Sequence, residues 1–229
     1  MKRMKVAKTV LETKKLTKVY RPGKQNEVRA LDGVDFKLKK ADFVALVGPS
    51  GSGKSTFMHL IGLLQRPTSG KIMIGGKDMT AISNKLYPKI RAKKIGFIFQ
   101  GFNLISTLSA IENVMLAGRY AGLSGKEARA RAEKILTELG LEERINHRPS
   151  ELSGGQEQRV AIARALINDP EIILADEPTG ELDSRNSAEI VKLLKELSRR
   201  GQTILIVTHN LEVAKKANKI IKMQDGKMI

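Results

Sequence analysis

Short apolar runs alternate with amphipathic stretches along the chain and predict one α/β domain. Residues 43–47, 171–175 and 203–207 are almost continuous apolar runs, the pattern of buried strands. Residues 187–200 carry apolar side chains at helical spacing instead, which predicts an amphipathic helix that Gly201 ends. The repeated alternation between apolar strand-like runs and amphipathic helix-like stretches favours a sheet with helices packed on it.

Strands are also predicted on both sides of these runs. Residues 16–20 and 34–38 alternate between polar and apolar on either side of a turn-rich break, which predicts an antiparallel sheet near the amino terminus. Residues 70–76 and 94–100 predict two further strands. Residues 219–229 predict a hairpin closed by an Asp-Gly turn.

The segment from about residue 105 to 150 is richer in charge and in helical periodicity. Ser124 and Glu127 have the spacing of a capping box, and Gly140 marks where the helix behind them stops. The apolar face between these points predicts packing rather than a ligand site. We therefore expect a helical subdomain in this part of the chain.

A glycine-rich loop follows the first apolar run and reads Gly48-Pro49-Ser50-Gly51-Ser52-Gly53-Lys54-Ser55-Thr56. A strand, G-x-x-x-x-G-K-S and then a helix is the context that a phosphate-binding loop requires. Its glycines let successive backbone N–H groups point at a polyphosphate, and the helix adds the positive end of its dipole. Lys54 suits the β- and γ-phosphates, and the Ser55 hydroxyl suits Mg²⁺. The loop predicts binding of a nucleoside triphosphate, and the alternative is an incidental glycine turn.

Polar side chains lie at the ends of three predicted strands. Asp176 and Glu177 follow one apolar run, His209 follows another, and Gln100 ends the strand at 94–100. Open α/β sheets bind ligands beyond the carboxyl ends of their strands. Asp176 can then reach the Mg²⁺, Glu177 can deprotonate an attacking water, and His209 can bond that water or the γ-phosphate. The simpler alternative for each is a solvated turn residue.

Other positions keep two interpretations. Tyr20, at the end of its strand, can stack on a nucleotide base or pack on the sheet. The segment Ser153-Gly154-Gly155-Gln156 opens a helix and leaves N–H groups free for an anion, but the local pattern alone favours a plain N-cap serine. His59 and His147 favour structural or solvated roles.

Composition narrows the class of protein. The 229 residues are 41% hydrophobic and 28% charged, as in soluble globular proteins, and they include no cysteine, which excludes disulfides and thiolate metal sites. No apolar run reaches the ~18–20 residues of a membrane span, and residues 1–5 lead into no signal-like apolar core. We therefore expect a cytoplasmic protein that reaches a membrane only through a partner.

The net charge of +17 has three interpretations: a solvated lysine-rich surface, attraction to an anionic membrane, or nucleic-acid binding. Basic residues are spread along the chain. Aromatic residues make up only 4% of it, which supplies few stacking platforms for single strands. Nucleic acid is the least favoured of the three.

Taken in order, these motifs resemble those of the ATP-binding-cassette ATPases over essentially the whole chain. The segment Leu152-Ser153-Gly154-Gly155-Gln156 matches the signature that is specific to that family. The match favours an anion site at the start of this helix over a plain N-cap serine. The resemblance implies a phosphate-loop NTPase core of the RecA-like type, formed by about residues 1–100 and 156–229. It also implies an amino-terminal antiparallel β subdomain and an inserted helical subdomain at about residues 101–155.

The resemblance implies roles for the nucleotide-binding residues. Tyr20 would stack on adenine, and Lys54 and Ser55 would hold the phosphates of ATP and the Mg²⁺ ion. Asp176 would also face the metal. Gln100 would touch Mg²⁺ or the attacking water and relay to a transmembrane partner.

The resemblance also implies that two copies share each site. Ser153 and Gly155 would cap the γ-phosphate of an ATP that is held by the other copy. Glu177 would be the general base, His209 would brace the γ-phosphate, and Asp183 would belong to the loop that crosses the dimer seam. The implied assembly is a head-to-tail homodimer around two ATP molecules, bound to a permease at the inner face of the cell membrane.

Local sequence narrows the resemblance further. Residues 100–104, 148–152 and 175–180 look like the lipoprotein-release and macrolide-export branch of the family.

Three positions depart from the family pattern. Ala41-Asp42 replaces a Gly-acidic turn, Glu157 follows the signature where Gln is usual, and Glu181 stands where a smaller or neutral residue is commoner. None of the three removes a catalytic atom, but Glu181 adds negative charge near the expected dimer seam.

Two alternative functions share some of these motifs with a transporter ATPase. A soluble cassette ATPase that acts on DNA would need zinc-binding cysteines or a coiled-coil insertion, and one that acts on ribosomes typically has two cassettes; the sequence shows none of these. A metabolic kinase would share the phosphate loop but would leave the signature unexplained. We therefore expect a transporter subunit that hydrolyses ATP and binds no nucleic acid, with its transported substrate undetermined.

Overall fold

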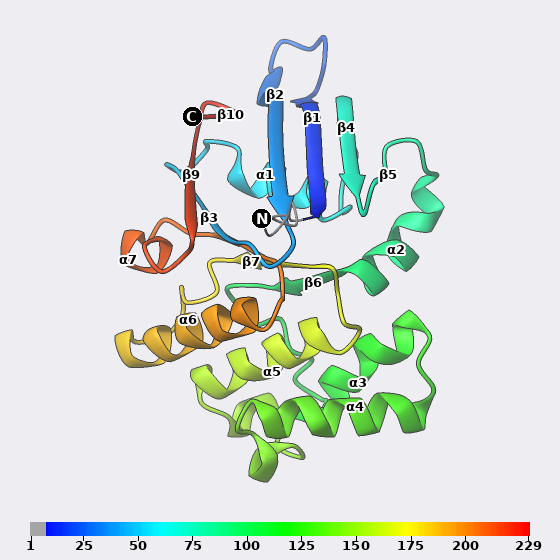
Figure 1. The fold of residues 1–229 in the computed structure, drawn as a ribbon, viewed down its shortest axis with the longest axis vertical. Helices are drawn as coiled ribbons and strands as arrows, with labels where there is room; N and C mark the ends of the chain where they lie inside the picture. The colour runs from blue at the N-terminus through cyan, green and yellow to red at the C-terminus, as the bar shows by residue number, and fades with distance from the viewer. Residues whose placement is uncertain (1–7) are drawn as a thin grey trace, which may run out of the picture.

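The computed structural model describes residues 8–229, which form two sheets with helices packed around them (Figure 1). The expectation about residues 1–5 concerns a segment outside this range. In the larger sheet the strand order is β10-β9-β3-β8-β7-β6, and every pair except β10-β9 is parallel. In the smaller sheet the order is β2-β1-β4-β5 and every pair is antiparallel. Within the described range, no helix combines the length and the hydropathy needed to cross a membrane.

The elements have the following bounds. The larger sheet contains β3 Phe43–Val47, β6 Ile95–Ile98, β7 Ile172–Asp176, β8 Ile204–Val207, β9 Lys219–Gln224 and β10 Lys227–Met228. The smaller sheet contains β1 Thr9–Tyr20, β2 Val28–Lys39, β4 Ser69–Ile74 and β5 Lys77–Asp78. The α-helices are α1 Lys54–Ile61, α2 Tyr87–Lys94, α3 Ala110–Ala121, α4 Gly125–Glu138, α5 Gly154–Leu166, α6 Ser184–Arg199 and α7 Leu211–Ala214. Short 3₁₀ helices are η1 Asn84–Leu86, η2 Glu142–Arg144 and η3 Pro149–Glu151.

The central strands of the larger sheet, β3, β8 and β7, are buried on both faces, which explains their continuous apolar runs. Side chains alternate along β3: Phe43 and Ala45 lie in a core shared with α3, α5 and α6, whereas Val44 and Leu46 lie in a second core shared with α1 and the smaller sheet. β7 and β8 divide their side chains between the same two cores. The larger sheet is therefore the middle layer, with the smaller sheet on one side and helices on the other (Figure 1).

Helices α3, α4 and α5 pack together on the side of the larger sheet away from the smaller sheet (Figure 1). The predicted capping box of α4 is present, because Ser124 Oγ accepts from the Glu127 N–H at 3.2 Å and Glu127 Oε2 accepts from the Ser124 N–H at 3.0 Å. Ser109 and Glu112 form the same motif at the start of α3, where no cap was predicted.

The strand predicted at 94–100 is shorter than expected. Lys94 is the last residue of α2, and β6 ends at Ile98, which is paired with Ala175 of β7. Beyond that pair the chain turns away from the sheet, so Gln100 lies in a turn two residues after the strand.

The unusual turn before β3 carries a strained residue. Ala41 has φ +63°, a conformation that costs an L-residue about 1–2 kcal/mol and glycine little. Its backbone is fixed there, since its N–H donates to Thr203 Oγ1 and its carbonyl accepts from Ser198 Oγ, both at 3.1 Å. The departure from glycine at this position therefore lowers stability.

Replacing Ala41 by Gly should raise the free energy of unfolding by about 0.5–1 kcal/mol, because the relief of backbone strain exceeds the added entropy of the unfolded chain. Denaturant unfolding measures the change. Ala188→Gly, at an exposed position within α6, is the matched control and should lose about 1 kcal/mol. Equal losses in the two variants would contradict the strain assignment.

Candidate functional site

Polar segments meet at the carboxyl-terminal edge of the larger sheet. The loop at 48–53 follows β3, the Thr208-His209 pair follows β8, and Glu177 follows Asp176, which ends β7. These three strands are neighbours and run parallel, so their carboxyl ends lie side by side.

The glycine loop after β3 has the shape of an anion cradle. Gly51 and Gly53 have φ +79° and +104°, which residues with a Cβ rarely adopt. A Cβ on Gly48 would overlap the Met223 carbonyl oxygen, and one on Gly53 would lie 2.5 Å from the Ala30 carbonyl oxygen. The first turn of α1 contains no acidic residue, so nothing there opposes an anion at its N–H groups. The loop therefore fits a polyphosphate.

Lys54 lies folded against this loop. Its ammonium donates to the carbonyl oxygens of Gly48 and Pro49, both at 2.8 Å, and to Ser52 Oγ at 3.4 Å. All three acceptors are uncharged. A phosphate oxygen can replace them favourably, because its negative charge adds Coulomb attraction to the ammonium that an uncharged acceptor does not provide.

The predicted metal ligands Ser55, Gln100 and Asp176 offer hydroxyl, amide and carboxylate oxygens, the donors that Mg²⁺ prefers. Burial, followed by the charge of Glu177, raises the pKa of Asp176, whereas His59 and Lys54 lower it. Residues 8–229 hold no cluster of three or more acidic or histidine side chains that could bind a metal alone. The donor set fits Mg²⁺ that shares its coordination with phosphate oxygens.

Glu177 and His209 are hydrogen-bonded to each other, which the sequence did not predict. Glu177 Oε1 accepts from the His209 backbone N–H at 2.8 Å and lies 2.7 Å from His209 Nδ1, while Oε2 accepts from the Thr208 hydroxyl at 2.9 Å. A carboxylate can only accept hydrogen bonds, so the proton of this bond is on Nδ1 of His209. The side chain of Glu177 is thereby fixed across the ends of β7 and β8.

The backbone of Glu177 is in an unusual conformation. Its φ of +43° is rare for a residue with a side chain and costs on the order of 1–3 kcal/mol. The Glu177 N–H donates to the Val207 carbonyl and the Gly180 N–H donates to the Glu177 carbonyl, both at 2.9 Å. Strain that surrounding bonds maintain in this way is typical of functional sites.

Tyr20 lies beside the phosphate loop, at the end of β1. Its hydroxyl donates to Gln65 Oε1 at 2.8 Å and lies 3.5 Å from the hydroxyl of Thr56, in the first turn of α1. The Lys18 ammonium lies 5.1 Å from the centre of the ring. The ring is only half-buried, so part of it can contact a ligand.

The signature residues form a separate polar hollow. Ser153 caps α5, since its Oγ accepts from the Gln156 N–H at 3.4 Å and its own N–H donates to Gln156 Oε1 at 2.9 Å. A hollow of about 500 Å³ is lined by Ser153, Gly155, Gln156 and Asp183, among others, and by no residue of the phosphate loop. Within one copy of the chain the two predicted anion sites therefore do not form one pocket.

Asp183 lies at this hollow and caps the next helix. Its carboxylate accepts from the Asn186 N–H at 2.8 Å and from Asn186 Nδ2 at 2.6 Å, bonds that lower the pKa of Asp183. Because of this cap, α6 begins at Ser184, earlier than the helix predicted at 187–200. Gly155 packs closely on the same helix, and a Cβ there would overlap Asn186 Oδ1.

The two acidic departures from the family pattern are neighbours. Burial, followed by the charge of Glu181, raises the pKa of Glu157. Glu181 also lies near Gly101, where an added Cβ would be 3.6 Å from Glu181 Oε1. Gln100 packs against Gly180, where an added Cβ would lie 3.0 Å from its side chain. The loops after β6 and β7 are thus in contact.

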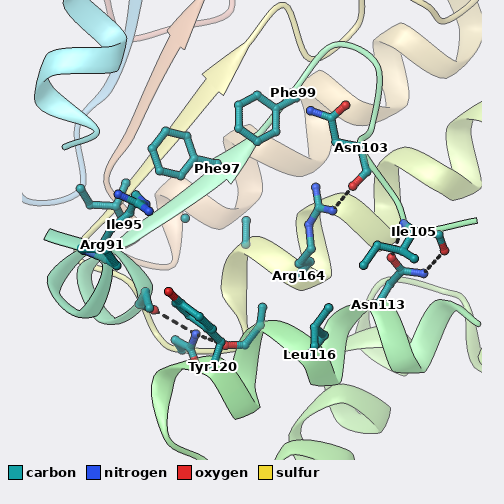
Figure 2. A pocket seen from close by; sticks show the side chains of 16 residues that line it. Arg91, Ile95, Phe97, Phe99, Asn103, Ile105, Asn113, Leu116, Tyr120 and Arg164 are labelled. Carbon is teal, nitrogen blue, oxygen red and sulfur yellow. Dashed lines mark hydrogen bonds between the residues drawn. The ribbon is translucent and has the colours of Figure 1, made fainter. Parts of the chain in front are cut away.

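A groove of about 490 Å³ opens between α2, β6 and α3 (Figure 2). Its walls are mainly apolar, and on α3 the side chains of Leu116 and Tyr120 are 46% and 68% exposed. Phe97 and Phe99 stack with their ring centres 5.5 Å apart, and Arg164 fixes the loop beyond β6 through the carbonyl oxygens of residues 102 and 103. Phe99 directly precedes Gln100, so the groove adjoins the predicted nucleotide site. The sequence did not reveal this groove, because its walls come from separate segments.

Comparison with known proteins agrees with this architecture. The family model described as ABC transporter matches residues 31–180. An "Uncharacterized ABC transporter ATP-binding protein" of Thermotoga maritima is 47% identical over 221 residues, which are 96% of this chain and 94% of that protein. The macrolide export ATP-binding/permease protein MacB of Hyphomonas neptunium is 49% identical over 220 residues, 96% of this chain but 34% of that protein. The chain thus spans about a third of the length of this macrolide export relative.

Solved structures show the same fold. A dimeric, post-hydrolysis structure of the ATP-binding cassette MJ0796 bound to ADP and Pi has a TM-score of 0.84 and 45% identity, covering 95% of each chain. cbiO1 of Clostridium perfringens, described as part of the ABC transporter complex cbiONQ, has a TM-score of 0.84 and 30% identity, covering 97% of this chain and 87% of that one. The expected phosphate-loop α/β fold is confirmed. These proteins fit the transporter expectation and not the alternative of a soluble ATPase that acts on DNA or ribosomes.

Proposed function

The chain belongs to the ABC transporter family, and from this membership we propose that it is the ATP-hydrolysing subunit of a transporter and drives a membrane permease. One observation carries the catalytic part of the proposal. A carboxylate, Glu177, is fixed by three donors at the sheet edge where the phosphate loop also opens. The fold thus places a proton acceptor next to a polyphosphate cradle.

In the proposed site, the loop N–H groups and Lys54 bind the phosphates of ATP, and Tyr20 stacks on the adenine. Ser55, Asp176 and Gln100 would hold Mg²⁺. When bound, this ion supplies positive charge that stabilises the negative charge of the reacting phosphate group. The chain's own part is to orient the triphosphate and to exclude all but one attacking water.

Glu177 is the proposed general base. Oε1 accepts two bonds from His209 and Oε2 accepts one from Thr208, so a lone pair of Oε2 remains for the attacking water. The ring of His209 is largely exposed, so it can also reach a γ-phosphate bound nearby.

We propose that a second copy of the chain completes each site. The signature hollow contains Ser153 and Gly155 but no residue of the phosphate loop, so each copy offers two separate halves. A head-to-tail homodimer pairs each half with its complement and encloses two ATP molecules. Asp183, which lines the same hollow, would then lie at the seam. The similar MJ0796 structure is described as dimeric.

The apolar groove next to Gln100 is the proposed docking site of the permease. Exposed apolar side chains on its rim, such as Leu116, favour a protein segment over water. We assign the groove to the interface between the core and a helical subdomain of about residues 101–155. The docked permease would place the chain at the inner face of the cell membrane. MacB of Hyphomonas neptunium, which is similar to this chain, is described as a macrolide export ATP-binding/permease protein.

Replacing Leu116 by Arg should prevent co-purification with the permease, because a charge would enter an apolar groove without a partner. ATP hydrolysis by the isolated chain should change less than twofold, since Leu116 does not touch the nucleotide site. Pull-down of the co-expressed permease measures the loss, for which we expect at least tenfold less recovery. Ile220→Arg is the control, an exposed apolar residue on β9 that should leave recovery unchanged. Normal recovery with Leu116→Arg would contradict this docking site.

A further inference from the structure

Exposed apolar side chains gather around α2. Nine large apolar side chains are exposed within residues 8–229, and five of them lie next to α2 or along the groove: Leu64, Leu86, Ile105, Leu116 and Tyr120. Leu64 lines a hollow on one side of α2, and the last three line the groove on its other side. Pro88 and Arg91 of α2 belong to both hollows, so the apolar residues surround one helix. The permease groove accounts for only part of this surface.

The same helix carries unneutralised positive charge. Residues 79–111 contain no aspartate or glutamate. Lys89 and Lys93 are one turn apart in α2, and Lys85 lies about one turn earlier in η1, so the three share one side of the segment. All three are exposed, and none pairs with an acidic side chain anywhere in the described range.

The remaining polar side chains of α2 point toward the protein and fix the helix. The Tyr87 hydroxyl donates to the Met79 carbonyl at 3.0 Å, Arg91 donates to the Leu63 carbonyl at 3.0 Å, and Lys94 pairs with Glu171. These contacts anchor one side of α2 and leave the lysine side outward. Lys85, Lys89 and Lys93 are therefore held on the surface by a fixed helix, and they do not turn inward to pair with an acidic residue of the protein.

We propose that the outward side of η1 and α2, with Lys85, Lys89 and Lys93, contacts the anionic surface of a lipid membrane. Lysines next to exposed apolar side chains, here Leu86, suit an interface where headgroups meet acyl chains. A nucleic acid would also offer negative charge to the lysines, but it has no apolar layer to cover the exposed apolar side chains. The orientation rests on the proposed function, because a permease seated in the adjoining groove turns α2 toward the bilayer.

Binding to lipid vesicles tests this proposal directly. The purified full chain should bind vesicles of equimolar phosphatidylglycerol and phosphatidylcholine, and it should bind phosphatidylcholine vesicles far more weakly. Binding should fall as salt rises. The triple variant Lys85→Gln, Lys89→Gln, Lys93→Gln should bind the anionic vesicles about a hundredfold more weakly, because each lysine near such a surface contributes about fivefold.

A second triple variant, Lys24→Gln, Lys39→Gln, Lys40→Gln, is the matched control. It removes the same charge from exposed lysines in or next to the turns of the smaller sheet, and it should keep most of the binding. Equal losses in the two variants would show that net charge alone acts, and no binding by the natural chain at low salt would also overturn the proposal. Competition by inorganic phosphate beyond that of sodium chloride at equal ionic strength would indicate a discrete anion site instead.

The vesicle measurement is independent of the ATPase assay. Failure of the chain to hydrolyse ATP or to bind a permease would contradict the proposed function and leave vesicle binding as measured. Loss of vesicle binding with normal hydrolysis would contradict only the membrane contact. Both triple variants should hydrolyse ATP at the natural rate in the absence of lipid, because none of the six lysines belongs to the nucleotide site.

Discussion

Replacing Glu177 by Gln should lower the turnover number for ATP by a factor on the order of 10²–10⁴, the usual contribution of a general base. The glutamine oxygen can still accept from Thr208 or His209, so the turn after β7 should keep its shape. It cannot take a proton from water at neutral pH. ATP binding should therefore be preserved while hydrolysis stops, and the ATP-bound dimer should accumulate.

Phosphate release under saturating ATP measures the turnover number, and gel filtration with ATP measures the dimer. Glu181→Gln is the matched control, since it removes a nearby carboxylate that makes no contact with His209. That variant should hydrolyse ATP within about threefold of the natural rate, as expected for a residue outside the proton transfer. Normal hydrolysis by Glu177→Gln would show that the base assignment is wrong.

Replacing Lys54 by Ala should weaken ATP binding by about 10²-fold, because a hydrogen bond between charged groups contributes about 1.5–3 kcal/mol. Turnover at saturation should fall further, since the lysine also stabilises charge that develops in the transition state. Isothermal titration measures the affinity, with Lys40→Ala, an exposed lysine outside the loop, as control.

Lys54 also has three neutral acceptors within the loop, so a structural explanation must be tested separately. These bonds are partly exposed, so water can replace them, and their loss should lower the free energy of unfolding without nucleotide by less than about 2 kcal/mol. A larger loss of stability with unchanged ATP affinity would mean that Lys54 holds the loop and does not bind phosphate.

The sequence predicted the elements whose pattern is local. β3, β7 and β8 are buried on both faces and are therefore uniformly apolar, and the phosphate loop needs glycines at particular backbone angles. The four-residue repeat of α4 and its capping box were equally visible. In each case the residues that determine the element are adjacent in the sequence.

The sequence was less informative where the pattern is interrupted. β1 extends from Thr9 to Tyr20, but only its last part was predicted, because its pairing with β4 shifts register between Lys14 and Thr17, and Lys15 has φ +48°. This bulge breaks the alternation that identifies a strand. α2 was not predicted either. It is rich in basic residues, and its few apolar residues do not form a stripe at helical spacing.

Contacts between distant segments could not be predicted from local pattern. The bond between Glu177 and His209 joins residues 32 positions apart and depends on the order of β7 and β8 in the sheet. The groove depends in the same way on how α2, β6 and α3 come together. The family resemblance supplied expected roles for the site residues, but not the arrangement that connects them.

In the proposed dimer, each ATP site takes its phosphate loop from one copy and its signature from the other. This arrangement can be tested by mixing two inactive chains, both carrying Glu177→Gln so that bound ATP is retained. One chain also carries Lys54→Ala, which disables the loop, and the other carries Gly155→Asp, which places a bulky negative charge in the signature. After removal of free nucleotide, we expect retained ATP only in the mixture, because only the mixed dimer contains one intact pair of halves. Retention by the Gly155→Asp chain alone, or none in the mixture, would contradict the shared site.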